Sequence, residues 1–130
     1  MSNEEKVKYW IELSDKDFHT AEWLIKGGHN LYAGFMCHQA IEKILKGYFT
    51  KMKEDTPPFT HDLTGLAQKT ELYELMNEQQ KDFIEDLNPL NMEARYPDYK
   101  NKIAQTMTKE VTQNMLTKTN ELLQWTKQKI

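Results

Sequence analysis

The feature that most constrains this chain is a helical spacing of apolar residues that recurs along most of its length. In the first segment, Glu4 to Lys26, apolar side chains return every three to five positions, and no glycine or proline interrupts them. Gly27 and Gly28 then end the segment, as glycines commonly do at helix C-termini. No stretch shows the apolar–polar alternation of a useful β-strand, so we expect an all-α protein.

The second segment predicts a helix from about Asn30 to Met52, with Asn30 as its N-cap. Pro57 and Pro58 then break the chain, because proline lacks an N–H donor and restricts the residue before it. A short helix is expected next, with Thr60 as its N-cap.

A third main helix is expected over Asn77–Leu87, where Asn77 and Gln80 resemble a capping box and Pro89 would end the helix. The last helix runs from about Thr108 to Lys129, with Val111 on its apolar stripe. Short links between successive helices favour antiparallel neighbours. The pattern therefore predicts an antiparallel up-and-down four-helix bundle with an additional short helix.

The composition of the chain limits the classes of function that it can have. The length of 130 residues predicts a single domain over residues 1–130. A net charge of −3 makes non-specific coating of nucleic acid a poor candidate, because that binding needs a basic face. The single cysteine, Cys37, fits a reducing compartment, and with no signal-peptide pattern or long apolar run we expect a cytoplasmic protein without membrane contact. No zinc, nucleotide-loop or dinucleotide motif is present, so we predict no metal and no cofactor.

Polar residues interrupt the apolar stripe of the second helix. His38 is either a half-buried histidine that hydrogen-bonds a neighbouring helix or a catalytic or ligand-contacting imidazole. Gln39 lies beside it. Glu42 and Lys46 at i,i+4 suit a surface ion pair, whereas Lys43 and Lys46 together suit a grip on a phosphate or a carboxylate.

Two further motifs stand outside the main helices. In Thr60-His61-Asp62, His61 is either a purely structural residue or one that flanks an anion bound at the start of the short helix. Arg95 is the only arginine among seventeen basic residues, which favours a site that needs a planar, bidentate guanidinium. It is either an internal clamp on carboxylates or carbonyl groups, or a phosphate or nucleotide contact with Tyr96 or Tyr99 stacked on a base.

Taken together, these motifs resemble the HEPN family of small helical domains. The segments that carry the resemblance occur in the expected order along nearly the whole chain: Tyr9-Trp10 with Asp15, Asp17 and Ala21-Glu22, then Gly28 with Tyr32-Ala33, His38 to Lys43 with Leu45-Lys46, Thr60 to Leu63, and Ala94 to Asp98. The resemblance implies a helical bundle that usually forms a homodimer. It also implies a small nucleotidyltransferase as partner, in a pair like a toxin–antitoxin module, and a nucleotide or RNA as ligand.

Many HEPN members are metal-independent ribonucleases that use an arginine followed four to six residues later by a histidine. Here no histidine follows Arg95, so that motif is absent. The leading hypothesis is therefore a non-catalytic or weakly catalytic HEPN-type binding module. One alternative is a ribonuclease in which folding brings Arg95 to His38 or His61, and another is a purely structural scaffold subunit. The expected site consists of residues His38, Gln39, Lys43, Lys46, His61, Arg95, Tyr96 and Asp98.

Overall fold

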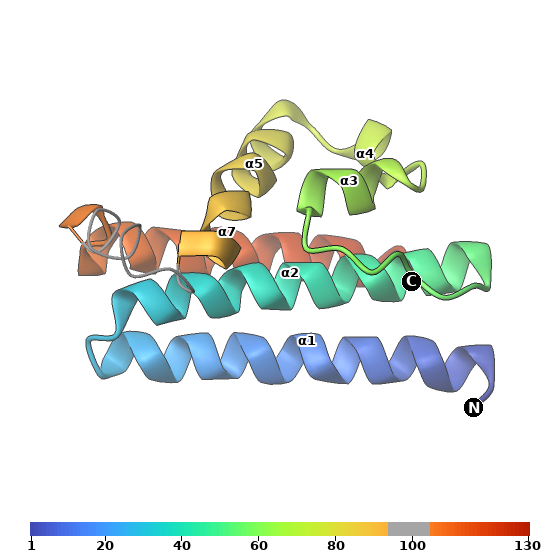
Figure 1. Ribbon diagram of the computed structural model, residues 1–130, viewed down its shortest axis with the longest axis horizontal. Coiled ribbons are helices and arrows are strands. Elements are labelled where there is room, and N and C mark those ends of the chain that lie inside the picture. Colours follow the sequence, from blue (N-terminus) through green and yellow to red (C-terminus); the bar gives the residue numbers. More distant parts are fainter. Residues whose placement is uncertain (94–104) are drawn as a thin grey trace.

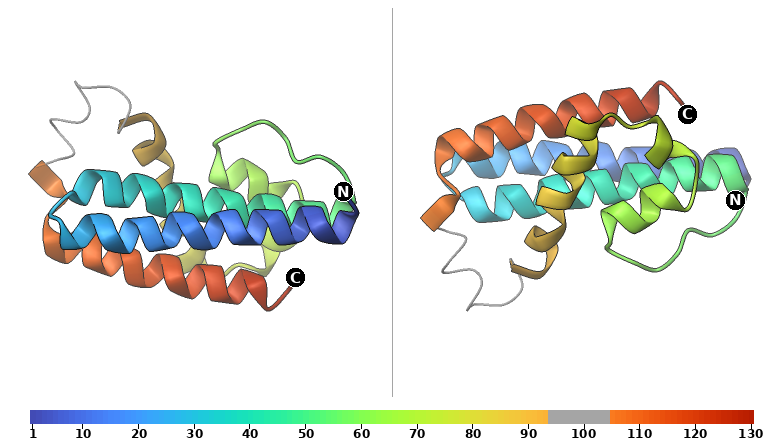
Figure 2. Two further views of the ribbon diagram at one scale, coloured as in Figure 1. Left: turned by 90° about the horizontal axis from the view of Figure 1, so that it is seen from below. Right: turned by 90° about the horizontal axis from the view of Figure 1, so that it is seen from above.

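The computed structural model describes residues 1–93 and 105–130, and within them every regular element is a helix. Three long helices, α1 (Asn3–Lys26), α2 (Asn30–Lys53) and α7 (Lys109–Lys127), lie side by side (Figures 1 and 2). The helix α5 (Glu78–Glu93) crosses them obliquely. The prediction of an all-α helical bundle is confirmed. The expected short helix is α3 (Leu63–Gln68), and it is followed by a further short helix that was not expected, α4 (Leu72–Leu75).

The capping chemistry of the first hairpin explains where its helices begin and end. Ser2 caps α1 through a complete capping box with Glu5. Gly28 adopts φ 78°, a left-handed conformation that glycine tolerates, and the chain reverses into α2. Asn30 was expected to cap α2 but lies inside its first turn, where its side-chain amide donates to the Met107 carbonyl oxygen at 3.0 Å. Asn30 therefore ties α2 to the residues just before α7.

The prediction that Pro89 ends the third main helix is wrong, because α5 continues through Pro89 to Glu93. A proline inside a helix removes one hydrogen bond and usually kinks the helix. The neighbouring Asn88 uses its side chain to bind the start of α3. Its side-chain oxygen accepts from the Leu63 backbone N–H at 2.8 Å, and its amide donates to Asp62 at 3.1 Å. Asn88 thus accepts a hydrogen bond from a backbone N–H group at the start of α3. The N-cap of α3 is Asp62 rather than the expected Thr60.

The helix α2 is the centre of the molecule, since it packs against α1, α7, α5 and α3. It approaches α1 closely: a Cβ atom at Gly47 would lie 3.1 Å from Cβ of Trp10, and Ser14 of α1 donates to the Ala40 carbonyl oxygen at 2.7 Å. Fully buried apolar side chains of α2, α3 and α5 complete the core, among them Ile41, Ile44, Leu63, Leu66, Ile84 and Leu87.

The helix α7 is rotated relative to the apolar stripe expected from its sequence. Val111 is 45% exposed, whereas Thr112, Thr119 and Thr126 are fully buried at intervals of seven residues. Each of these hydroxyl groups donates to the carbonyl oxygen four residues earlier, at 2.7–2.8 Å. Because that bond satisfies the hydroxyl, threonine packs in the core like an apolar residue. In the described part of the chain no helix is long and apolar enough to cross a bilayer.

Candidate ligand-binding site

The polar residues of α2 form a cluster between that helix and the segment that leads into α3. His38 is fully buried, and its Nε2 donates to the backbone carbonyl oxygen of His61 at 3.0 Å. Burial lowers the pKa of His38 to about 4, the Glu42 charge opposing this shift, so the imidazole is neutral at pH 7. We assign His38 a positioning role, because its ring fixes the backbone that carries His61.

Glu42 joins the cluster one helical turn further along α2. Its buried carboxylate binds Nδ1 of His61 at 2.8 Å with one oxygen and Nζ of Lys46 at 3.1 Å with the other. Burial raises the pKa of Glu42, but the hydrogen bond and charge of His61 and the charge of Lys46 outweigh it, so the pKa is lowered. The alternative of a surface pair between Glu42 and Lys46 is wrong, since their side chains are only 3% and 9% exposed.

His61 is the member of the cluster that meets solvent. Its side chain is 42% exposed, and of its two ring nitrogens only Nδ1 is held by a partner within the described residues. Phe59 lies beside it with 98% of its surface exposed, and the two ring centroids are 6.2 Å apart. Because Glu42 holds Nδ1 of His61, the imidazole offers Nε2 as one hydrogen-bonding atom, and the exposed ring of Phe59 offers one face for stacking.

Gln39 and Lys43 belong to a second polar network on α2. The Gln39 amide donates to Asn91 of α5 at 3.2 Å and accepts from Nζ of Lys43 at 3.2 Å. Lys43 also pairs with Asp17 of α1 at 3.0 Å. Lys43 and Lys46 thus bind different carboxylates rather than sharing one anion. This network connects α2 to both α1 and α5.

The structure therefore brings together four of the expected site residues, His38, His61, Lys46 and, through its neighbour on α2, Gln39. Lys43, also expected at the site, is instead bound to Asp17 of α1 and to Gln39. The remaining three expected residues, Arg95, Tyr96 and Asp98, lie outside the described residues. Sequence reasoning missed Glu42 as the centre of the cluster, although its spacing of four from both His38 and Lys46 was the available signal. It also missed Phe59, an aromatic residue directly after two prolines in a polar link. Among the described residues no group of three or more His, Cys, Asp or Glu side chains is arranged to hold a metal ion.

Comparison with known proteins identifies the family to which this helical chain belongs. The family model of the HEPN domain matches residues 7–130, so the chain belongs to the HEPN family. Its fold is similar to the crystal structure of TT1696 from Thermus thermophilus, with a TM-score of 0.82 and 19% sequence identity. That match covers 96% of this chain and 98% of the other. No curated protein matches the chain.

Proposed function

We propose that this HEPN chain is a binding module for a nucleotide, held where His61 and Phe59 meet solvent. One observation carries the proposal: a half-exposed imidazole, anchored by a buried carboxylate, lies beside a fully exposed phenylalanine ring. The base would stack on Phe59, and Nε2 of His61 would hydrogen-bond a phosphate or a ribose hydroxyl. Arg95 and Tyr96 stay predicted contacts of the same ligand.

Calorimetric titration with ATP, GTP and AMP tests this proposal, and Phe59→Ala is the informative variant. Because Phe59 is 98% exposed, its removal leaves the core unchanged. Stacking of a base on an aromatic side chain contributes about 1–3 kcal/mol, so we expect the affinity to fall at least about fivefold. Trp23→Ala is the matched control, because Trp23 is an aromatic residue on α1 that is 78% exposed. Absence of heat with all three nucleotides, at protein above ~100 μM, would remove the proposal.

A second candidate function is phosphodiester cleavage of RNA, and the pairing of His61 with Glu42 favours it specifically. With Nδ1 bound to a carboxylate, Nε2 can take a proton from a 2′-hydroxyl or return one to a leaving oxygen. Of the two histidines considered with Arg95, only His61 reaches solvent, since His38 is fully buried.

Incubation with total RNA tests this activity. If His61 moves the proton, His61→Gln lowers the rate about a hundredfold or more, whereas His19→Gln, an exposed histidine on α1, has no effect. Cleavage that survives His61→Gln would exclude the mechanism and indicate a contaminating nuclease.

The HEPN resemblance also motivates two partner proposals, a homodimer and a complex with a small nucleotidyltransferase. Light scattering of the purified chain tests the first, and we expect twice the mass of one chain. Co-expression with the product of a neighbouring nucleotidyltransferase gene tests the second, and we expect co-purification. Failure of either experiment leaves the nucleotide proposal intact, because the cluster of His61 and Phe59 lies within one chain.

A further inference from the structure

A groove separates α5 from α7 on the face away from α1. Both helices pack against α2, and in addition α5 packs against α3 and α7 packs against α1. A cavity of about 560 Å³ lies between α5 and α7 and is lined by side chains of both helices. That volume lies within the range of roughly 300–1,000 Å³ of sites that take ligands.

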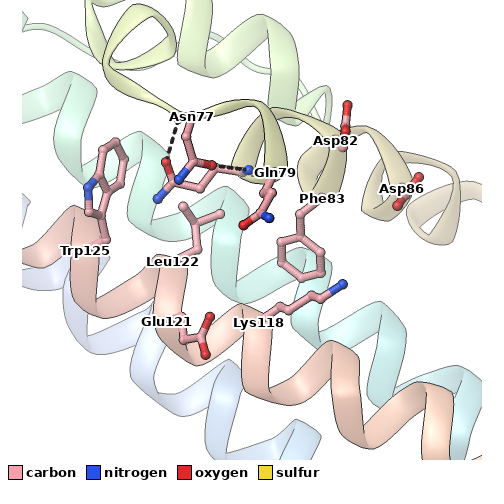
Figure 3. Close-up of a pocket in the computed structure, with 10 residues that line it drawn as sticks. Asn77, Gln79, Asp82, Phe83, Asp86, Lys118, Glu121, Leu122 and Trp125 are labelled. Carbon is pink, nitrogen blue, oxygen red and sulfur yellow. Dashed lines mark hydrogen bonds between the residues drawn. The ribbon is translucent and has the colours of Figure 1, made fainter.

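The floor of the groove is apolar. Figure 3 shows Phe83 reaching from α5 toward α7, and Leu122 and Trp125 rising from α7 toward α5. Phe83 and Leu122 are buried, whereas Trp125 is half-buried. Asn77 and Gln80 at one end of the groove are fixed by their reciprocal capping bonds of 2.9 and 2.8 Å. The groove therefore has a rigid end and an aromatic floor.

The rim of the groove is acidic. Asp82 and Asp86 line it from α5, one helical turn apart, and Glu121 lines it from α7. Lys118 is the one cation in the lining, against these three carboxylates. All four side chains are exposed, and within the described part of the chain none of them forms an ion pair. This excess of negative charge opposes phosphate groups and anionic lipids and attracts cations.

We propose that the groove between α5 and α7 docks a short basic, amphipathic helix of a partner protein. Apolar side chains at i and i+4 of that helix would cover Phe83, Leu122 and Trp125, and flanking lysines or arginines would pair with Asp82, Asp86 and Glu121. The described part of the chain offers no strand edge, which leaves a helix in a groove as the suitable mode of peptide recognition. The site is separate from the cluster around His61, so this proposal does not depend on the nucleotide.

Chemical-shift mapping of the full-length protein by NMR tests the proposal. The probe is a helical peptide of about 18 residues with leucines on one face and lysines on the other, since shorter helices are marginal in water. We expect shifts confined to Gln79–Asp86 of α5 and Lys118–Trp125 of α7. A peptide with glutamates in place of the lysines is the matched probe, and we expect it to bind at least about tenfold more weakly.

Variants of the rim residues test whether peptide binding depends on the groove itself or only on the overall charge of the protein. Asp82→Lys with Asp86→Lys should weaken binding of the basic peptide about tenfold or more. Glu121→Lys, on the other wall, provides the same test independently of α5. Glu85→Lys is the control, because Glu85 is an exposed acid on α5 outside the groove, and this variant should bind like the original chain.

Four outcomes would overturn the proposal. The first is equal binding of the two peptides, or shifts that fall outside the groove. The second is unchanged binding by both rim variants, or equal loss in the Glu85→Lys control. The third is the same groove shifts with spermidine at the same concentration, which would indicate a site for a small cation. The fourth is concentration-dependent groove shifts without peptide, which would indicate a second copy of this chain.

Discussion

At the scale of single residues, the unusual property of this chain is the number of polar groups buried along α2. His38, Glu42, Lys46 and Thr50 are all less than 9% exposed, and each has a hydrogen-bond partner. A buried polar side chain without a partner lowers the stability of the fold by about 1–3 kcal/mol. Each of these groups therefore depends on the presence of its partners. The set also explains why two motifs distant in the sequence act together: His38 holds the backbone of His61, 23 residues away, and Glu42 holds its ring, 19 residues away.

The neutral state of His38 predicts how stability depends on pH. Its pKa of about 4 in the folded protein lies below the ordinary value of 6.5, so the unfolded chain binds more protons between these pH values. The contribution of His38 is complete above about pH 6.5 and decreases toward pH 4, with a limiting slope of about 1.4 kcal/mol per pH unit. Urea denaturation at pH 7, 6 and 5 measures this slope.

His38→Gln is the variant that isolates this effect. Its side-chain amide keeps a donor for the His61 carbonyl oxygen but does not titrate. We expect a lower stability at pH 7 and a flatter dependence on pH than in the original chain. An unchanged slope in His38→Gln would mean that other groups cause the acid sensitivity.

The buried pair of Glu42 and Lys46 predicts a large penalty for removing one partner. Glu42→Gln leaves Lys46 as an uncompensated buried ammonium group, and we expect a loss of about 3–5 kcal/mol in the free energy of unfolding. The double variant Glu42→Leu with Lys46→Met removes both charges and should be less destabilising than the single change. A loss below about 1 kcal/mol in Glu42→Gln would be typical of an exposed pair and would contradict this burial argument.

At the scale of elements, helix ends decide where the candidate site lies. The helix α3 has no side-chain cap of its own, and Asn88 of α5 supplies the missing acceptor. Because Asn88 also binds Asp62, the residue after His61, this part of α5 positions the segment that carries Phe59 and His61. A single residue of one helix thus fixes the N-terminus of another.

Asn88→Ala tests this coupling between elements. Loss of a capping acceptor costs about 0.5–2 kcal/mol, and we expect a destabilisation in that range from thermal or urea unfolding. Asn120→Ala on α7 is the control, because Asn120 is exposed and its bond to Gln124 is long at 3.4 Å. Its effect should stay within about 0.5 kcal/mol. Equal effects of the two variants would show that Asn88 does not act as a cap.

At the scale of the whole molecule, stability is distributed unevenly. The helices α1, α2 and α7 pack along their lengths, and α2 contributes the most completely buried residues, including Ala40, Ile41 and Ile44. The short helices α3 and α4 have six and four residues and are held on one side of the molecule. Although Leu63, Leu66 and Leu72 of these two helices are buried, each helix has only one or two turns, and short segments at the edge of a fold open locally more easily than its centre.

Hydrogen exchange measured by mass spectrometry tests this distribution. We expect amides in the middle of α2 to exchange only through global unfolding, and amides of α3 and α4 to exchange earlier through local opening. The control is the added denaturant: a low urea concentration should accelerate exchange in α2 but leave exchange in α3 and α4 nearly unchanged. Equal protection of all helices would contradict the uneven distribution.

The sequence by itself determined the helical class, the approximate range of every long helix and the capping box of Asn77 and Gln80, because these depend on spacing and on contacts between residues three or four apart. The polar spacing on α2 also pointed to His38 and Lys46. Only the tertiary structure decided that Glu42 is buried, that Thr112 rather than Val111 faces the core, and that α5 continues through Pro89. Each of these depends on a partner distant in sequence or on a hydroxyl satisfied by its own helix, and local patterns do not contain that information. The same holds for Phe59, whose exposure beside His61 follows from the path of the chain between α2 and α3.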